Sequence, residues 1–434
     1  MGSKGSALSG VQGQSPWSSY RHLLRLPNLR ALLLATCCAR LAGRMFMLAI
    51  VLYALDRFHS PVLAGWVAFL TFAPGMAISP LAGAILDRVG AARAIVVDMA
   101  ASATLVAALA LCGLSGAMHP AVLLGLGGVF SLTGPLGAAG IRTLIPFLVP
   151  PAALDRANAL DTSSFALIDM TGPALAGGLF AVAGGDATLL VIGALYATAC
   201  ASLLRLRHMG PSRSGRRSLL REAADGVLYV IRHRALRGLA IAYSLGQASW
   251  GMMLVVVPVF VGRLYGPGGQ TDTLTGLVWT ADGVAACVGS LIAGHVQSAG
   301  RERHFIGLGM LLLAFALWPV AALFGLGGLF AGMALAGFLG GFVDVGTLTL
   351  RQRVTDPAWF GRTLAVSMSL NLSGVPVGSA IGGALAAWSL PVAFVAAALA
   401  AAVAAASAYA LIPGERITEP PSPAPAPDAG CPPT

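Results

Sequence analysis

Long apolar runs separated by short polar segments dominate the pattern of residues along this chain. A helix needs about 20 predominantly apolar residues to cross the hydrocarbon core of a bilayer. Twelve segments reach that length, at about 29–55, 62–86, 94–117, 120–148, 158–183, 187–206, 236–262, 273–297, 305–325, 327–352, 362–388 and 391–412. The pattern predicts an all-α polytopic membrane protein with twelve transmembrane helices.

The composition excludes a soluble helical protein. Only 10% of the 434 residues are charged, against about 25% in typical soluble domains, and 57% are hydrophobic. A soluble protein of this composition would expose apolar patches large enough to drive aggregation. The 55 glycines instead suit helices in lipid, where small residues let backbones approach one another.

Polar segments divide the chain into two helical halves, 29–206 and 236–412. Residues 1–28 are Ser/Gly-rich and then basic, and we expect them in the cytoplasm. Residues 207–235 form a basic linker, whose second part has the spacing of an amphipathic helix lying on the cytoplasmic lipid surface. Residues 413–434 are Pro-rich, so we expect a disordered cytoplasmic tail.

Basic residues predict the orientation, because Lys and Arg concentrate in cytoplasmic loops. With the N-terminus inside, only Arg57 and Arg263 of the 27 Lys and Arg residues fall in outside loops. We therefore expect a multi-pass protein of the inner cell membrane with both termini in the cytoplasm. The net charge of +10 lies between apolar spans rather than on one face. This placement argues for the lipid bilayer as a partner and against nucleic acid.

The two halves resemble each other. Three short matches occur in the same order and at nearly the same separation, namely Gly90 and Arg93 with Gly300 and Arg303, Arg156 with Arg362, and Gly177 with Gly383. Two sets of six helices in the same orientation form a parallel repeat, an arrangement found in secondary transporters. The repeat predicts two six-helix halves.

The sequence GAILDRVGAAR follows the second span and contains Gly83, Asp87, Arg88, Gly90 and Arg93. A tight turn needs glycine for unusual backbone angles. Asp87 and the arginines can form a charged latch that is made in one conformation and broken in another. The segment resembles the loop 2–3 signature of the major facilitator superfamily, G-x-x-x-D-R-x-G-x-x-R. The resemblance implies the major facilitator fold and a structural and gating role for these residues.

A second resemblance concerns the fifth span. Gly172–Pro173 followed by Ala176–Gly177 looks like the helix 5 antiporter signature, with one glycine replaced by alanine. The region around it resembles the branch that contains enterobactin exporters and macrolide efflux proteins. Proline bends the helix and small residues permit close contact with a partner. The resemblance implies antiport.

Two arginines, Arg40 and Arg44, lie four residues apart on one face of the first span. A charge in hydrocarbon costs roughly 2.5–3.5 kcal/mol on insertion scales, so it should be paired or line water. We prefer Asp169 as the partner of Arg40, because the two lie at comparable depth. The efflux branch usually carries an acid at the position of Arg44. Two interpretations stay open: a contact with an anion or substrate, and a structural pair with a buried acid.

Other acids have different predicted roles. Asp282 and Asp344 lie deep in their spans and are candidates for carrying protons. The alternative is a neutral, hydrogen-bonded acid or a helix end where the bilayer is locally thinned. Asp98 and Asp161 lie nearer the predicted cytoplasmic surface, where we expect them to serve the latch and helix capping.

Four further residues are candidates for a substrate cavity. Tyr243, Gln247 and Trp250 share one face of the seventh span, and Asn371 lies in the eleventh. Aromatic rings with a few hydrogen-bonding groups suit amphipathic ligands, although packing between helices explains the same pattern. Gly374, Gly378 and Gly382 form a stripe expected to allow close helix packing.

The leading functional hypothesis is proton-coupled efflux of a small amphipathic compound by alternating access. The alternative is uptake or facilitated transport of an organic anion. The sequence contains no Walker-type phosphate loop, no HExxH and no G-x-S-x-G motif, so we expect neither ATP coupling nor an enzyme. Cysteines without metal-ligand spacing predict no metal site. We expect a monomer that needs no cofactor.

Overall fold

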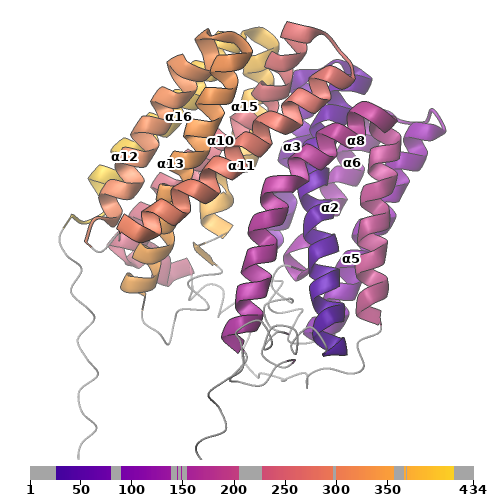
Figure 1. The fold of residues 1–434 in the computed structure, drawn as a ribbon, viewed down its shortest axis with the longest axis horizontal. Coiled ribbons are helices and arrows are strands. Elements are labelled where there is room, and N and C mark those ends of the chain that lie inside the picture. The colour runs from indigo at the N-terminus through magenta and orange to yellow at the C-terminus, as the bar shows by residue number, and fades with distance from the viewer. Residues whose placement is uncertain are drawn as a thin grey trace, which may run out of the picture. The chain divides into compact units, whose positions relative to one another are not determined.

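The computed structural model describes residues 26–79, 89–137, 144, 148, 154–204, 227–296, 300–355, 366–367 and 369–414. Within these ranges the regular elements are helices (Figure 1). They are α2 (Pro27–Phe58), α3 (Pro61–Leu70), α5 (Ala91–Leu114), α6 (Pro120–Ser131), α8 (Leu154–Leu204), α10 (Arg234–Tyr265), α11 (Gly269–Val296), α12 (Glu302–Phe315), the π-helix η2 (Ala316–Ala321), α13 (Gly325–Val354), α15 (Gly374–Trp388) and α16 (Leu390–Leu411).

The helices confirm the predicted membrane fold. Eleven stretches in the described part of the chain are long and apolar enough to cross a membrane. One of them, Leu167–Leu204, has 38 residues and contains Gly184, whose φ of 79° and ψ of 174° are not helical. Only glycine adopts such a conformation readily. Gly184 therefore separates the fifth and sixth predicted spans, so the described residues contain a helical stretch for each of the twelve predicted spans.

Local sequence explains where several helices begin. Proline stands in the first turn of α2, α3, α6 and α16, where its missing N–H group would have no helical partner. The turn between α2 and α3 consists of two residues. His59 ends α2 with a positive φ of 50°, and the Ser60 hydroxyl accepts a hydrogen bond from the Leu63 N–H at 3.2 Å.

The chain forms two compact units. Unit 1 contains residues 1–219, 254–280 and 379–388, and unit 2 contains 220–253, 281–378 and 389–434. Helices α10, α11 and α15 therefore each contribute residues to both units. These units do not coincide with the predicted six-helix halves, 29–206 and 236–412, and that division stays a prediction.

Each unit has its own core. In unit 1, α2 and α5 both pack against the long helix α8 (Figure 1). The Ser202 hydroxyl of α8 donates to the Ala31 carbonyl of α2 at 2.9 Å. In unit 2, α12 packs between α13 and α16, around buried residues such as Ile306, Met310 and Ala405.

Part of the predicted latch can be described. Gly83, Asp87 and Arg88 lie outside the described residues, as do residues 1–25, 205–226 and 415–434 of the predicted terminal segments and linker. Gly90 has a φ of 88° and Gly300, its predicted repeat counterpart, a φ of 72°. Both precede a helix, α5 or α12. Both glycines thus have the positive φ that favours glycine at these positions.

Two glycines of the predicted close-packing stripe lie against α10. A Cβ atom on Gly374 would lie 2.7 Å from the Ala248 nitrogen, and one on Gly378 would lie 2.8 Å from the Ala248 Cα. The Ser244 and Ser373 hydroxyl oxygens of the same contact are 2.9 Å apart.

We expect Gly374→Ala to lower the stability of the protein by about 1–3 kcal/mol, because overpacking forces backbones apart. Gly340→Ala is the matched control. Gly340 lies in α13 with no atom within 4 Å of an added Cβ, so alanine there should be neutral. The thermal melting temperature of each purified variant in one detergent measures the effect. Equal melting temperatures for the two variants would contradict the close contact.

Candidate functional site

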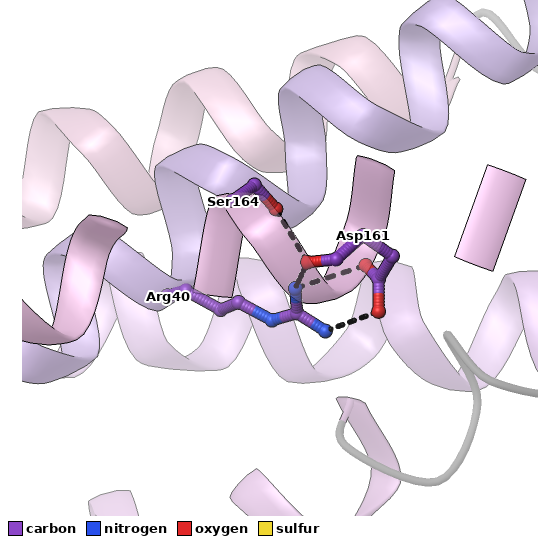
Figure 2. A network of polar contacts seen from close by, with 3 residues as sticks. All are labelled: Arg40, Asp161 and Ser164. Atoms are coloured by element: carbon purple, nitrogen blue, oxygen red, sulfur yellow. Dashed lines mark hydrogen bonds and ion pairs between the residues drawn. The ribbon is translucent and has the colours of Figure 1, made fainter. Parts of the chain in front are cut away.

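Arg40 of α2 is held by Asp161 of α8 (Figure 2). Its Nη1 lies 2.9 Å from Asp161 Oδ1, and its Nη2 donates to Oδ2 at 3.0 Å. Nη1 also donates to the Asp161 backbone carbonyl at 3.1 Å, which accepts a second bond from the Ser164 hydroxyl at 2.7 Å. The two charged side chains are only 16% and 13% exposed. This geometry is a bidentate ion pair, whose charge-assisted hydrogen bonds are stronger than those between neutral groups.

Arg44, one turn further along α2, pairs through its Nε with Asp169 of α8. This pair is more open, because its side chains are 32% and 40% exposed. The predicted partnership of Arg40 with Asp169 is therefore wrong, and so is the capping role expected for Asp161. Matching the depth of Cα atoms could not select the partner, since an arginine side chain extends over more than one helical turn.

The two pairs determine the net charge where α2 meets α8. Each positive charge of α2 faces a negative charge of α8, so together the pairs add no net charge to the membrane-spanning region. An uncompensated charge there would be costly. Of the two open interpretations of the arginines, the structure supports the pair with an acid.

The antiporter-like motif is built around this arrangement. A Cβ on Gly172 would lie 2.7 Å from the Cβ of Arg44, so glycine leaves the space that Arg44 occupies beside α8. Further along α8, a Cβ on Gly276 of α11 would lie 2.8 Å from the Pro173 carbonyl oxygen and 3.2 Å from the Gly177 Cα. The motif therefore packs α8 closely against α2 and α11 within unit 1.

Unit 2 contains a second polar cluster. The Tyr243 hydroxyl of α10 donates to Asp344 Oδ1 of α13 at 2.6 Å, and the Gln247 side chain also hydrogen-bonds Tyr243. Asp344 is exposed. Tyr243 thus contacts both a second predicted cavity residue, Gln247, and a predicted proton-carrying acid, Asp344.

Arg351 lies two turns after Asp344 on α13 and is 4% exposed. Its Nη2 donates to the Asn371 amide oxygen at 2.5 Å, and the Asn371 nitrogen donates to the Ser367 carbonyl at 3.1 Å. Within the described residues, Arg351 Nε and the buried Thr347 and Ser367 hydroxyls have no hydrogen-bond partner. Buried unsatisfied polar groups are uncommon in folded proteins, and here they are one nitrogen of Arg351 and two hydroxyls.

Sequence reasoning missed two of these features. Arg351 was not predicted as a site residue, although its spacing of seven residues from Asp344 places both on one face of α13. The second missed feature is the hydrogen bond that the Tyr53 hydroxyl of α2 donates to Asp186 Oδ1 at 2.8 Å. The sequence offers no indication of this contact except the helix break at Gly184, two residues before Asp186. Trp250 and Asp282 are half-buried, and their roles stay predictions.

Comparison with known proteins decides the family. The sequence profile of the Major Facilitator Superfamily matches residues 32–273 and again residues 239–432. The chain belongs to this superfamily. It is 49% identical over 379 residues to the MFS-type transporter y4rN of Sinorhizobium fredii, covering 87% of this chain and 93% of that protein.

Two further likenesses are more distant. The multidrug efflux pump Tap of Mycolicibacterium fortuitum is 26% identical over 370 residues, covering 82% of this chain and 89% of the pump. The crystal structure of the nucleoside transporter NupG superposes with a TM-score of 0.71 at 13% identity, covering 89% of this chain and all of that one. At this low identity, the likeness to NupG shows a shared fold and nothing more. The chain is thus a multi-pass membrane transporter of the major facilitator fold.

We expect Asp161→Asn and Asp169→Asn each to destabilise this transporter, because each leaves an arginine of α2 without its acid. Removing one partner of a buried pair typically costs about 3–5 kcal/mol. The loss should be smaller for Asp169, whose pair with Arg44 is more exposed and better screened by water.

The double variants Arg40→Gln/Asp161→Asn and Arg44→Gln/Asp169→Asn should recover part of that loss. Melting temperatures in detergent for the two single variants and the double variant give the coupling energy of each pair. Strictly additive losses in both cycles would show that the pairs contribute nothing.

Proposed function

We propose that this transporter exports a small amphipathic compound in exchange for protons, by alternating access across the inner membrane. It acts as a monomer with both termini in the cytoplasm. The observation that carries the proposal is the contact between Asp344 and Tyr243 inside membrane-spanning helices. Likeness to a multidrug efflux pump supports the direction of transport.

Asp344 is suited to couple protonation to helix movement. While its carboxylate is ionised, the Tyr243 hydroxyl donates to it and links α10 to α13. Protonation removes the charge from the span and weakens the charge-assisted bond. A proton therefore changes the relative free energies of conformations that make or break this link.

The polar groups of the site favour an amphipathic substrate over an anion. Tyr243 and Gln247 offer one aromatic ring and hydrogen-bonding groups on the same face of α10. The arginines of α2, which motivated the organic-anion alternative, are already paired with acids. An incoming anion would have to displace Asp169 from Arg44.

The remaining site residues complete the proposed cycle. Gly83, Asp87, Arg88, Gly90 and Arg93 would act as a conformational latch between states. The close packing of Gly177 against Gly276 provides a surface along which α8 and α11 can separate and rejoin without breaking large side-chain contacts.

A transport assay tests this function. In inverted membrane vesicles, an acidic lumen should drive accumulation of ethidium, and a protonophore should abolish it. Export from the cell corresponds to movement into the lumen of such vesicles. The proposal would be contradicted by two results together. Ethidium accumulation would not depend on the proton gradient, and right-side-out vesicles would take up an organic anion without a gradient.

Substitutions at two acids, each of which accepts a hydrogen bond from a tyrosine, test whether Asp344 couples transport to protons. Asp344→Asn should remove most gradient-driven accumulation and its dependence on lumenal pH, since the amide cannot carry the proton. Asp186→Asn is the matched control, because Asp186 also accepts from a tyrosine hydroxyl but has no assigned part in coupling. If both variants keep the wild-type pH profile, Asp344 is not the coupling acid.

A further inference from the structure

Unit 1 contains a cavity of about 690 Å³ at the turn between α2 and α3. Its wall is completed by the end of α10, the start of α11 and the end of α15, all through residues of unit 1. Cavities of about 300–1,000 Å³ accommodate drug-sized ligands. None of the Arg40, Arg44, Asp344 and Arg351 side chains lines the cavity.

Most of the wall is apolar. Leu52 and Leu55 come from α2, Val62 from α3, Pro258 and Val259 from α10, and Ala387 from α15. Such a surface binds the hydrocarbon part of a ligand, while a few polar groups fix its orientation. The nature of those polar groups therefore indicates the ligand class.

The charged groups of the wall favour a cation. Asp56, near the end of α2, and Asp272, in the first turn of α11, both line the cavity and repel each other electrostatically. Arg263 also lines it and offsets one of the two negative charges, while its Nη2 donates to the Ala386 carbonyl at 2.9 Å and ties α10 to α15. The wall therefore keeps one more negative than positive charge. His59 is the remaining titratable group of the wall. A cation placed between the two acids relieves their repulsion.

Two helices of the wall are in close contact, because a Cβ on Gly65 of α3 would lie 3.0 Å from the Cα of Gly383 in α15. The start of α11 packs against α8, outside the wall, where a Cβ on Gly269 would lie 3.2 Å from the Cβ of Ala181. The cavity thus exists where these helix ends pack together, and its walls would separate if they moved apart. A ligand bound here stabilises the packed arrangement.

We propose that this cavity binds an organic cation with an apolar body, at a site separate from the proton-coupling cluster of unit 2. The proposal rests on the cavity within a transporter and is independent of proton exchange or the direction of transport. A compound held here contacts α2, α3, α10, α11 and α15 at once.

Two probes of the same size and opposite charge test it. Tetraphenylphosphonium should bind the purified full-length protein in detergent, without any gradient, at least about tenfold more tightly than tetraphenylborate. Isothermal titration calorimetry measures both affinities. Equal affinities, or tighter binding of the borate, would overturn the proposal.

Variants of the two acids in the wall test whether the phosphonium binds in this cavity. Asp56→Asn and Asp272→Asn should each weaken phosphonium binding about tenfold, because each removes one attractive charge. Asp56→Glu keeps the charge and should keep the affinity, which separates charge loss from misfolding. Asp186→Asn, at an acid outside the cavity wall, should leave it unchanged.

A different pattern would reject the site. If Asp344→Asn weakens phosphonium binding while Asp56→Asn and Asp272→Asn do not, the cation binds elsewhere. Because no gradient is present, failure of proton-coupled transport in vesicles has no bearing on this result, and the two proposals fail separately.

Discussion

The pairing of α2 arginines with α8 acids is the constraint on which unit 1 depends. Arg40 with Asp161 and Arg44 with Asp169 place four charges in helices that lipid would otherwise exclude. Because each arginine has its own acid, the pairs fix which turn of α2 faces which turn of α8. Gly172 leaves room for Arg44, and the same stretch of α8 then presents Pro173 and Gly177 to α11.

This constraint also shapes the chemistry of the transporter. Pairing makes the α2–α8 contact neutral overall, so the charges available to a ligand lie elsewhere. In unit 2, the hydrogen bond between Tyr243 and Asp344 is the proposed site of proton coupling. In the unit 1 cavity, Asp56 and Asp272 create a negative field within an apolar wall. The two proposals thereby involve different residues for proton coupling and for cation binding.

Much of the fold could be predicted from the sequence, because the bilayer imposes a minimum length on every apolar helix. The twelve spans, the Gly374 and Gly378 packing stripe and the glycine turn at Gly90 all follow from simple rules. The partner of Arg40 could not be predicted. Long side chains reach across helical turns, and helix-to-helix register depends on packing that no single span encodes. The Arg351–Asn371 contact was missed for the same reason.

Charge reversal at the α2–α8 contact tests the central claim most directly. Arg44→Asp alone places two acids together, and Asp169→Arg alone places two arginines together, so neither single variant should yield stable, monodisperse protein in detergent. The exchanged variant Arg44→Asp/Asp169→Arg restores opposite charges and should recover monodisperse protein with a melting temperature well above that of either single variant. An exchanged variant no more stable than the worse of the two single variants would contradict the account.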